Sequence, residues 1–466
     1  MISSPIIWIF IPFLAGLLFL MIRNERIVRI SSIFLVLFLA LAANFFKQDF
    51  TLTIAGFDLK IISGLHILGR ELTLEQSAQP LIGLIYSALF LWFLYLGMLK
   101  IPIRTIPLFL LVSTTLIAAI CVKPFLYAAM LIEIALLISV PLLYQPESKD
   151  HISLFRFITF QTLSMPFILF SGWLLTGSNT GPAQSTLTVQ AASFLGLGFV
   201  FLLAVFPFNT WIPMLAEKVP SYASAFILWI FSTISLIFAL YFFENYPWIR
   251  ESSFLPGIIR MLGIVTVVSS GILVAFQEDL KRIMAHAILM ETGFSLLAIS
   301  FFTSVGLNIF FALLIQRTIT IPFWSSAISS LTQNNSDSTY SSSGGLGKSH
   351  PLSGFLLLIC HFSIAGVPFI AGFASHQSIW ELLGQASIPL AVWYWIALIG
   401  YLIGGLRSFH ILFIAKEGGS EPVVAHWFQR IFLSLGILAL ILLGIFPQLT
   451  GQLADILPRM FTHLGK

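Results

Sequence analysis

Long runs of apolar residues dominate the chain and are separated by mostly short polar segments. A helix needs about 20 mostly apolar residues to cross the hydrocarbon core of a bilayer. The runs are too long for the strands of a membrane barrel and do not alternate strictly between apolar and polar positions. The pattern predicts an all-α integral membrane protein with about fourteen transmembrane helices, at 5–22, 27–46, 77–98, 103–122, 124–144, 152–176, 190–215, 221–243, 257–276, 283–303, 305–330, 352–384, 388–413 and 428–447.

The longer polar segments are 47–79, 177–189 and 333–349. The last of them, QNNSDSTYSSSGGLGKS, has the composition of a flexible loop. Fourteen Lys and Arg residues lie on the side of the odd-numbered loops, and eight lie on the side of the even-numbered loops and both termini. Because cytoplasmic loops carry the excess of positive charge, we expect both termini and segment 47–79 to face outside.

The composition excludes several other classes of protein. Hydrophobic residues make up 58% of the 466 residues and charged residues only 9%, against about 25% charged residues in soluble domains. The net charge of +4 is scattered without a basic block, so we expect no nucleic-acid partner. The two cysteines lie in apolar runs and indicate neither a disulfide nor a metal site. The sequence shows no nucleotide, flavin or cluster motif, so we expect no cofactor and no redox chemistry in this chain.

Helix-breaking residues interrupt the seventh and twelfth runs. The seventh contains VFPFNTWIP, with Pro207 and Pro213, and the twelfth contains AGVPFIAGF, with Gly366, Pro368 and Gly372. A proline removes a helical hydrogen bond, and in a membrane the freed carbonyl must be satisfied by protein or water. One such break alone is more simply a kink in a packed helix. Two breaks five helices apart are typical of transporters built from inverted repeats, with the pathway at the breaks.

We therefore predict two inverted five-helix repeats with broken helices 7 and 12. The first repeat holds helices 4–8 within residues 103–243, and the second holds helices 9–13 within residues 257–413. Helices 1–3 precede the repeats in residues 1–102, and helix 14 follows them at 428–447.

Each predicted repeat has one carboxylate inside its second helix. Glu133 and Glu291 both lie nine residues after the expected start of their helix, counted from Pro124 and Arg282. A charged side chain inside the membrane costs about 2.5–3.5 kcal/mol on insertion scales, so it normally faces protein or water and has a function. The simpler alternative is a protonated carboxyl group bonded to one backbone carbonyl. Both residues are candidates for a proton pathway.

Three histidines, His286, His361 and His376, lie in or beside the tenth and twelfth runs. Imidazole changes charge near neutral pH and can relay protons, although a packed, hydrogen-bonded histidine is at least as common. His376 is the most distinctive of the three because it directly follows the second break, in GFASHQSIW.

Three segments resemble signatures of the antiporter-like subunits of complex I and of Mrp antiporters. FPFNTWIPMLAEKVPS is similar to their P-(F/L)-H-x-W-(L/T)-P-D motif, and FQEDLKRIMAHAILMETGF is similar to their Q-x-D-(L/I)-K-R motif and the helix that follows it. GGLGKSHPLSG and AGVPFIAGFASHQ are similar to their G-G-L and G-x-P-x-x-x-G-F motifs. The resemblance covers residues 75–447 and implies a subunit of the M, N or Mrp D type.

The resemblance gives Glu133 the position of the family's glutamate in helix 5. The lysine that the family has in helix 7 corresponds to Leu202, and the lysine of helix 8 falls near Thr233. The first half of the chain therefore has the carboxylate that the family uses, but no obvious cation that would change the protonation of this carboxylate.

In the second half, the resemblance places Glu291 where the family has a histidine and His286 where it has a tyrosine. His376 takes the place of the lysine or glutamate of helix 12, and Gln316 and Arg317 correspond to a polar or basic pair in helix 11. These five residues form a second set of candidates for a proton pathway.

Three functions stay open at this point. The chain could be a proton-conducting membrane subunit of a complex I-like or Mrp-like assembly, or a structural subunit of the same kind of assembly that has lost proton transfer. The third alternative is a membrane partner in an energy-coupled inorganic-carbon uptake complex. We expect other membrane subunits, the lipid bilayer and protons, or Na⁺, as partners, and an energy-transducing inner membrane as the location.

Overall fold

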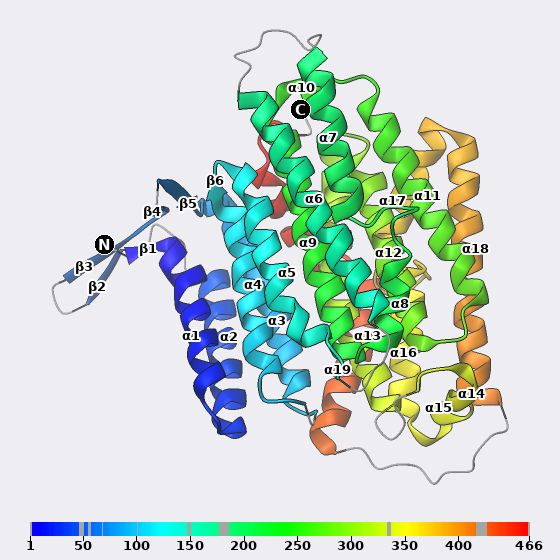
Figure 1. The fold of residues 1–466 in the computed structure, drawn as a ribbon. Coiled ribbons are helices and arrows are strands. Elements are labelled where there is room, and N and C mark those ends of the chain that lie inside the picture. The colour runs from blue at the N-terminus through cyan, green and yellow to red at the C-terminus, as the bar shows by residue number, and fades with distance from the viewer. Residues whose placement is uncertain are drawn as a thin grey trace.

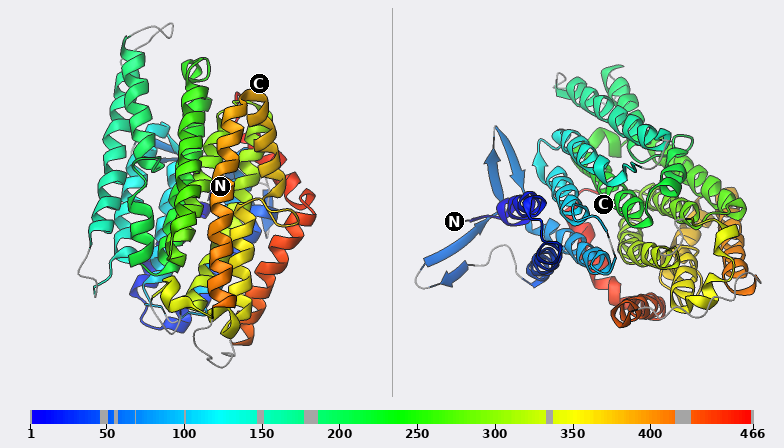
Figure 2. Two further views of the ribbon diagram at one scale, coloured as in Figure 1. Left: turned by 90° about the vertical axis from the view of Figure 1, so that its right-hand side faces the viewer. Right: turned by 60° about the horizontal axis from the view of Figure 1, so that its bottom comes forward.

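The structure is a computed structural model that describes residues 2–45, 51–54, 57–67, 69–99, 101–146, 151–176, 186–332, 337–415 and 426–464. Most of these residues lie in helices packed side by side with roughly parallel axes (Figures 1 and 2). The α-helices are α1 Ile11–Met21, α2 Glu25–Phe45, α3 Gln79–Leu96, α4 Thr105–Cys121, α5 Ala128–Leu143, α6 Ile152–Thr176, α7 Thr186–Leu202, α8 Trp211–Lys218, α9 Ser221–Asn245, α10 Pro247–Arg250, α11 Leu255–Phe276, α12 Leu280–Ile299, α13 Ser304–Leu331, α14 Tyr340–Ser343, α15 Leu346–Ser349, α16 Pro351–Ile364, α17 Phe373–Ala386, α18 Ile388–Phe409, α19 Trp427–Ile445 and α20 Gln448–Ile456.

Every predicted transmembrane run contains an apolar helix. Among the described residues, nine helices are long and apolar enough to cross a membrane, and the remaining predicted runs hold shorter apolar helices. The shorter helices are Ile6–Met21, Thr105–Cys121, Ala128–Leu143, Val189–Leu202 and Pro351–Ile364. The predicted helical, multi-pass membrane fold is confirmed, while the number of complete crossings stays a prediction.

Short strands depart from the all-helical expectation. They are β1 Ile2–Ser3, β2 Thr51–Ile54, β3 Phe57–Ile62, β4 Gly64–Ile67, β5 Arg70–Thr73 and β6 Val122–Lys123. The strands form two small sheets in the orders β1-β3-β2 and β4-β5-β6, with Leu52 opposite Leu59 and Leu72 opposite Val122. Most of segment 51–73, which was expected to be only a polar connection, is therefore in strands, and FDLKII shows the alternation that suits them.

The connections predicted for one side of the membrane gather at one end of the bundle. β1 pairs with β3, and β5 pairs with β6 between α4 and α5. At the same end, the Glu244 carboxylate at the end of α9 accepts the backbone N–H groups of Thr462 and His463, each at 2.9 Å. Five of the charges used to predict orientation, Lys47, Lys100, Lys149, Lys416 and Lys466, lie outside the described residues.

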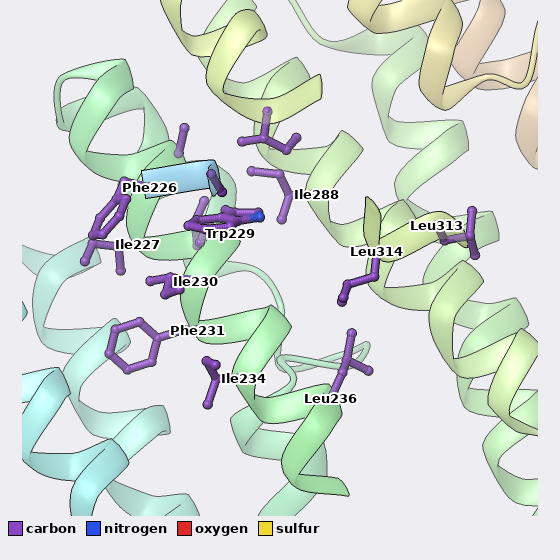
Figure 3. Packing of buried hydrophobic residues seen from close by; sticks show 14 of the residues in the cluster. Phe226, Ile227, Trp229, Ile230, Phe231, Ile234, Leu236, Ile288, Leu313 and Leu314 are labelled. Carbon is purple, nitrogen blue, oxygen red and sulfur yellow. The ribbon is translucent and has the colours of Figure 1, made fainter. Parts of the chain in front are cut away.

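The centre of the bundle is a seam between α9, α12 and α13. In an apolar stretch of 18 residues within each helix, buried residues make up 83% in α9 and 94% in α12, but only 22% in α19 at the edge of the bundle. Figure 3 shows Trp229 and Leu236 of α9 turned toward Ile288 of α12 and Leu314 of α13. These side chains are fully or almost fully buried, so the seam is close-packed and apolar apart from the few polar groups described below.

The same packing pairs occur twice along the chain. In the first half α4 packs on α5, α5 on α6, and α6 on both α7 and α8. In the second half α11 packs on α12, α12 on α13, and α13 on both α16 and α17. In each half, the third helix therefore lies against both parts of the broken helix.

Candidate functional site

Two helices are broken at the predicted places, between α7 and α8 by residues 203–210 and between α16 and α17 by residues 365–372. Each first part is ended by a residue in the left-handed region, Ala204 (φ 49°) or Gly366 (φ 67°). The next residue then donates its N–H to the carbonyl five residues earlier, which is the long bond of the Schellman motif. These bonds run from Val205 to Val200 and from Val367 to Phe362, at 3.1 Å each.

The prolines differ in where they lie. Pro207 and Pro368 are within the gaps, where no helical hydrogen bond is required of them. Pro213 is inside α8, at its third residue, and so belongs to the second part of the broken helix instead of the break. A proline is tolerated in the first turn because the N–H groups there have no partner within the helix.

Two glycines of the second break leave room for predicted site residues. Gly372 has a φ of 94°, and a Cβ built on it would lie 2.4 Å from Nε2 of Gln316. A Cβ on Gly366 would lie 2.6 Å from Cγ of the His376 ring. Both positions therefore require glycine for two reasons, the left-handed backbone and the side chain that fills the space.

A glutamine amide satisfies a carbonyl at the end of each first part. Gln316 of α13 donates through Nε2 to the Ser363 carbonyl at 2.9 Å, and Gln161 of α6 donates through Nε2 to the Leu202 carbonyl at 3.1 Å. The Ser363 hydroxyl continues the polar contact by donating to the Ala371 carbonyl across the break, at 2.9 Å. In a membrane such carbonyls need a partner from protein or water, and here the protein supplies it.

Glu291 and Arg317 form an ion pair in the buried centre. Both side chains are 0% exposed, and Nε of Arg317 lies 3.8 Å from Oε2 of Glu291, which is too long for a hydrogen bond. The guanidinium donates instead to the hydroxyls of Ser295 at 3.1 Å and Ser232 at 3.3 Å. Within the described part of the chain, neither carboxylate oxygen has a hydrogen-bond partner. The charge of Glu291 is therefore compensated while its oxygens keep their capacity to accept a proton.

His376 is held at the start of α17, against the helix that carries Glu291. Its Nδ1 lies 2.7 Å from the Tyr394 hydroxyl, and its ring meets Phe294 edge-on at 4.6 Å between centroids. Phe294 lies one turn beyond Glu291 on α12. Nε2 of His376 is buried and has no hydrogen-bond partner among the described residues, so a titratable group with a free nitrogen packs on the helix that carries Glu291.

The other two histidines are placed differently. His286 lies nearer the start of α12, with Nε2 3.5 Å from the Gln277 amide nitrogen. His361 is stacked on Tyr401 at 4.1 Å with an angle of 11° between the rings, and its Nε2 lies 2.8 Å from the Tyr401 carbonyl. His361 thus matches the simpler alternative of a packed, hydrogen-bonded histidine.

A cavity of about 330 Å³ reaches the second break from the end of the bundle that holds the C-terminal residues. Asn308 and Thr450 line it near that end, Ser375 and Ser378 of α17 line it further in, and Gln316 lies among its walls. The cavity therefore extends from Asn308 to Gln316 of α13, whose amide bonds to the end of the helix before the second break.

The sequence model of the family described as NADH:quinone oxidoreductase/Mrp antiporter, transmembrane part, matches residues 87–406, which is more than half of the chain. The chain belongs to this family.

Curated relatives within the family have a fairly low identity to the chain. Subunit N of NADH-quinone oxidoreductase from Cytophaga hutchinsonii is 24% identical over 266 residues, covering 56% of this chain and 57% of that protein. Subunit N of F(420)H(2) dehydrogenase from Methanosarcina mazei is 26% identical over 312 residues, covering 63% of this chain and 60% of that protein. The chain thus matches less than two thirds of the length of these relatives.

Solved structures of much lower identity share the fold over almost their whole length. A chain of respiratory complex I from Thermus thermophilus has a TM-score of 0.79 at 19% identity, covering 99% of this chain and 100% of that chain. A chain of the Mrp complex from Dietzia has a TM-score of 0.81 at 15% identity, covering 98% and 97%. At these identities the comparison concerns the fold alone.

The first half of this antiporter-family chain lacks a cation where the motifs lead one to expect it. Glu133 accepts a hydrogen bond from the Thr162 hydroxyl at 2.8 Å and lies near the edge of the bundle, since its neighbours Ile134 and Leu137 are 46% and 56% exposed. Leu202 and Thr233, at the expected lysine positions, are both buried. Glu133 therefore has a neutral hydrogen-bond donor as its partner.

The two halves of the family fold nonetheless repeat one arrangement. Gln161 and Thr162 are consecutive on α6, and they bond to the break and to Glu133 respectively. Gln316 and Arg317 are consecutive on α13, and they bond to the break and pair with Glu291. Sequence reasoning missed Gln161 and Thr162. They lie nine and ten residues after the predicted start of their helix at 152, whereas Gln316 and Arg317 lie eleven and twelve residues after the predicted start of theirs at 305, so aligning the helix starts does not bring the two pairs together.

Proposed function

We propose that the chain is a proton-conducting subunit of a membrane complex of the complex I or Mrp type, and that conduction runs through its second half. The buried Glu291–Arg317 pair supports this most directly, because an ionisable pair in the membrane interior is costly and marks an ion pathway in transporters. His376, which packs on the helix that carries Glu291, adds a second titratable group, and the cavity that reaches Gln316 adds an accessible polar space.

The proposal includes the two inverted repeats, in residues 103–243 and 257–413. The recurrence of packing pairs supports them. So does the recurrence of a carboxylate on the second helix, a glutamine and its neighbour on the third, and a Schellman ending on the broken helix. Residues 1–102 and helix 14 at 428–447 then flank the repeats.

The second candidate is a subunit of the same kind of complex that does not conduct protons. Thr162, Leu202 and Thr233 favour it, because they leave Glu133 without the cation that would switch its protonation. The relatives named above belong to redox complexes and the structural neighbours to redox and antiporter complexes, which favours such a complex over an inorganic-carbon uptake complex.

Proton uptake by the complex reconstituted in vesicles separates the two candidates. We expect Glu133→Gln to change uptake little, and His376→Ala or Glu291→Gln to reduce it by on the order of a hundredfold, as loss of a proton-transfer group does in enzymes. Uptake is expressed per assembled complex, so that a variant that merely assembles poorly is not mistaken for an inactive one. A loss with Glu133→Gln as deep as with the others would show that the first half conducts as well, and unchanged uptake in all three variants would leave the non-conducting subunit as the answer.

We further propose that the chain lies in an energy-transducing inner membrane beside other membrane subunits, with both termini outside. The gathering of 51–73, Lys123 and the C-terminal residues at one end supports their lying on one side. Ser253, an exposed residue between α10 and α11, belongs to the same side in this scheme. A cysteine at Ser253 is expected to react with an impermeant thiol reagent in intact cells, because the native Cys121 and Cys360 are buried. Reaction only after permeabilisation would reverse the orientation.

A further inference from the structure

A second cavity, of about 330 Å³, is lined by none of the candidates for the proton pathway and lies between α7, α9, α10 and α11. Its walls are mainly apolar and include Leu195 and Phe199 of α7, Phe243 of α9, and Ile258 and Leu262 of α11. The cavity therefore lies at the junction of the two halves of the chain. It also touches Leu203 and Val205 at the first break.

Two residues at one end of this cavity have polar atoms without a hydrogen-bond partner in the described part of the chain. Trp248 and Ser252 both line the cavity, and their Nε1 and Oγ atoms are buried and unpaired among the described residues. A buried donor without an acceptor costs about 1–3 kcal/mol. The exposed Glu251 carboxylate lies between them in the sequence and also lines the cavity. This end is therefore suited to a ligand that presents an acceptor to the donors and a positive charge to the carboxylate.

The cavity continues as a shallow groove along α11. Phe254, Ile258, Met261 and Val265 line this continuation. The stretch from Leu255 to Val265 rises about 15 Å at the usual 1.5 Å per residue, which is half of the roughly 30 Å hydrocarbon core. A partner helix crossing the bilayer would need twice that depth, so the groove matches a chain that occupies a single leaflet.

We propose that this groove binds one glycerophospholipid with an amine headgroup. An acyl chain lies along the apolar walls of α7 and α11, and an ester carbonyl accepts hydrogen bonds from Trp248 Nε1 and Ser252 Oγ. The ammonium of the headgroup faces Glu251. Tryptophan is common at this depth of the membrane because its ring is apolar and its N–H is polar. The lipid so bound fills the junction between the halves and covers the first break on its apolar side.

Two glycines give a way to fill the groove without disturbing the protein. A Cβ built on Gly196 of α7, in the cavity, or on Gly257 of α11, in the groove, has no atom within 4 Å. Gly196→Leu therefore places its side chain in the space proposed for the acyl chain. Gly384→Leu on α17 is the matched control, because a Cβ there also meets nothing within 4 Å and the position lies outside the cavity and the groove.

The test is photolabelling of the assembled complex in membranes with phosphatidylethanolamine that carries a diazirine on one acyl chain, followed by mapping of the modified peptides. We expect adducts concentrated in 187–202 and 254–265, reduced at least fivefold by Gly196→Leu and unchanged by Gly384→Leu. We expect Trp248→Phe combined with Ser252→Ala to lower labelling as well, and the same probe with a phosphatidylglycerol headgroup to label more weakly.

Other outcomes would overturn the proposal. Labelling spread evenly over the exposed faces of α18 and α19 would show ordinary contact with bulk lipid. Labelling in 187–202 and 254–265 that is unchanged by Gly196→Leu would show that the acyl chain does not enter the groove. Absence of labelling there, with the groove protected by a neighbouring subunit, would show a protein occupant. Equal labelling by both headgroups would remove the role given to Glu251.

Discussion

Replacing Glu291 with leucine is expected to destabilise the protein by about 3–5 kcal/mol, the usual cost of removing one partner of a buried ion pair. Arg317 would be left fully buried with two serine hydroxyls as its hydrogen-bond partners. A guanidinium does not lose its proton in proteins, so the stranded charge cannot be neutralised. The expected observation is a sharp fall in the temperature at which the detergent-solubilised complex unfolds, together with poor assembly in the membrane.

The reverse change distinguishes this explanation from a simple loss of packing. In Arg317→Met the stranded group is a carboxylate, which can take up a proton, so the destabilisation should be smaller than in Glu291→Leu. The double variant Glu291→Leu/Arg317→Met should recover most of the stability, because well-packed apolar residues often replace a buried pair without loss. It should still fail to conduct protons. If the destabilisation of the double variant equals the sum of the destabilisations of the two single variants, the stability of the protein does not depend on Glu291 and Arg317 compensating each other's charge.

Replacing Gly372 with alanine is the second change with a large expected effect, about 2–4 kcal/mol of destabilisation. A left-handed backbone costs a residue with a Cβ about 1–2 kcal/mol, and the new methyl group would displace the Gln316 amide from the Ser363 carbonyl, leaving buried polar groups without partners. The unfolding temperature of the complex should fall, and proton uptake per assembled complex should fall with it, because Gln316 is where the surface cavity reaches the break.

Gly384→Ala is the matched control for this experiment. Gly384 is inside α17, the helix that follows Gly372, and a Cβ there meets nothing within 4 Å. Since alanine is favoured over glycine inside a helix by about 0.5–1 kcal/mol, this variant should be as stable as the unmodified protein or slightly more so. Equal stability of Gly372→Ala and Gly384→Ala would mean that the second break tolerates a side chain and that its geometry differs from the one described.

Much of the fold could be predicted because the membrane makes each helix a long apolar run, and because Pro207, Pro368 and Gly366 mark the breaks directly. The strands between residues 51 and 73 could not be predicted in the same way. They are only four to six residues long and lie in a polar segment, where the apolar pattern that identifies a helix is missing.

The candidate site was predictable residue by residue but not in its pairings. Glu291 and Arg317 stand out as charges inside apolar runs, yet the apolar residues of α13 are spread around the whole helix, so its sequence does not show which face meets α12. Gln161 and Thr162 could not be singled out from the sequence, because uncharged polar residues are common in membrane helices. The contacts across the breaks depend on how α6 and α13 lie against the broken helices, and only the folded structure gives that.

The close-packed seam of α9, α12 and α13 has a consequence for the kind of transport that this scaffold permits. Carriers that work by rocking one repeat against the other open and close a gap between the two halves in every cycle. Here the contact between the halves lies deep in the bundle, with the buried side chains of Trp229, Ile288 and Leu314 facing one another in it. Opening it would expose a large apolar surface at each turnover. A rigid protein in which protons hop between fixed groups avoids that cost. The architecture therefore favours a proton channel over a carrier with moving domains.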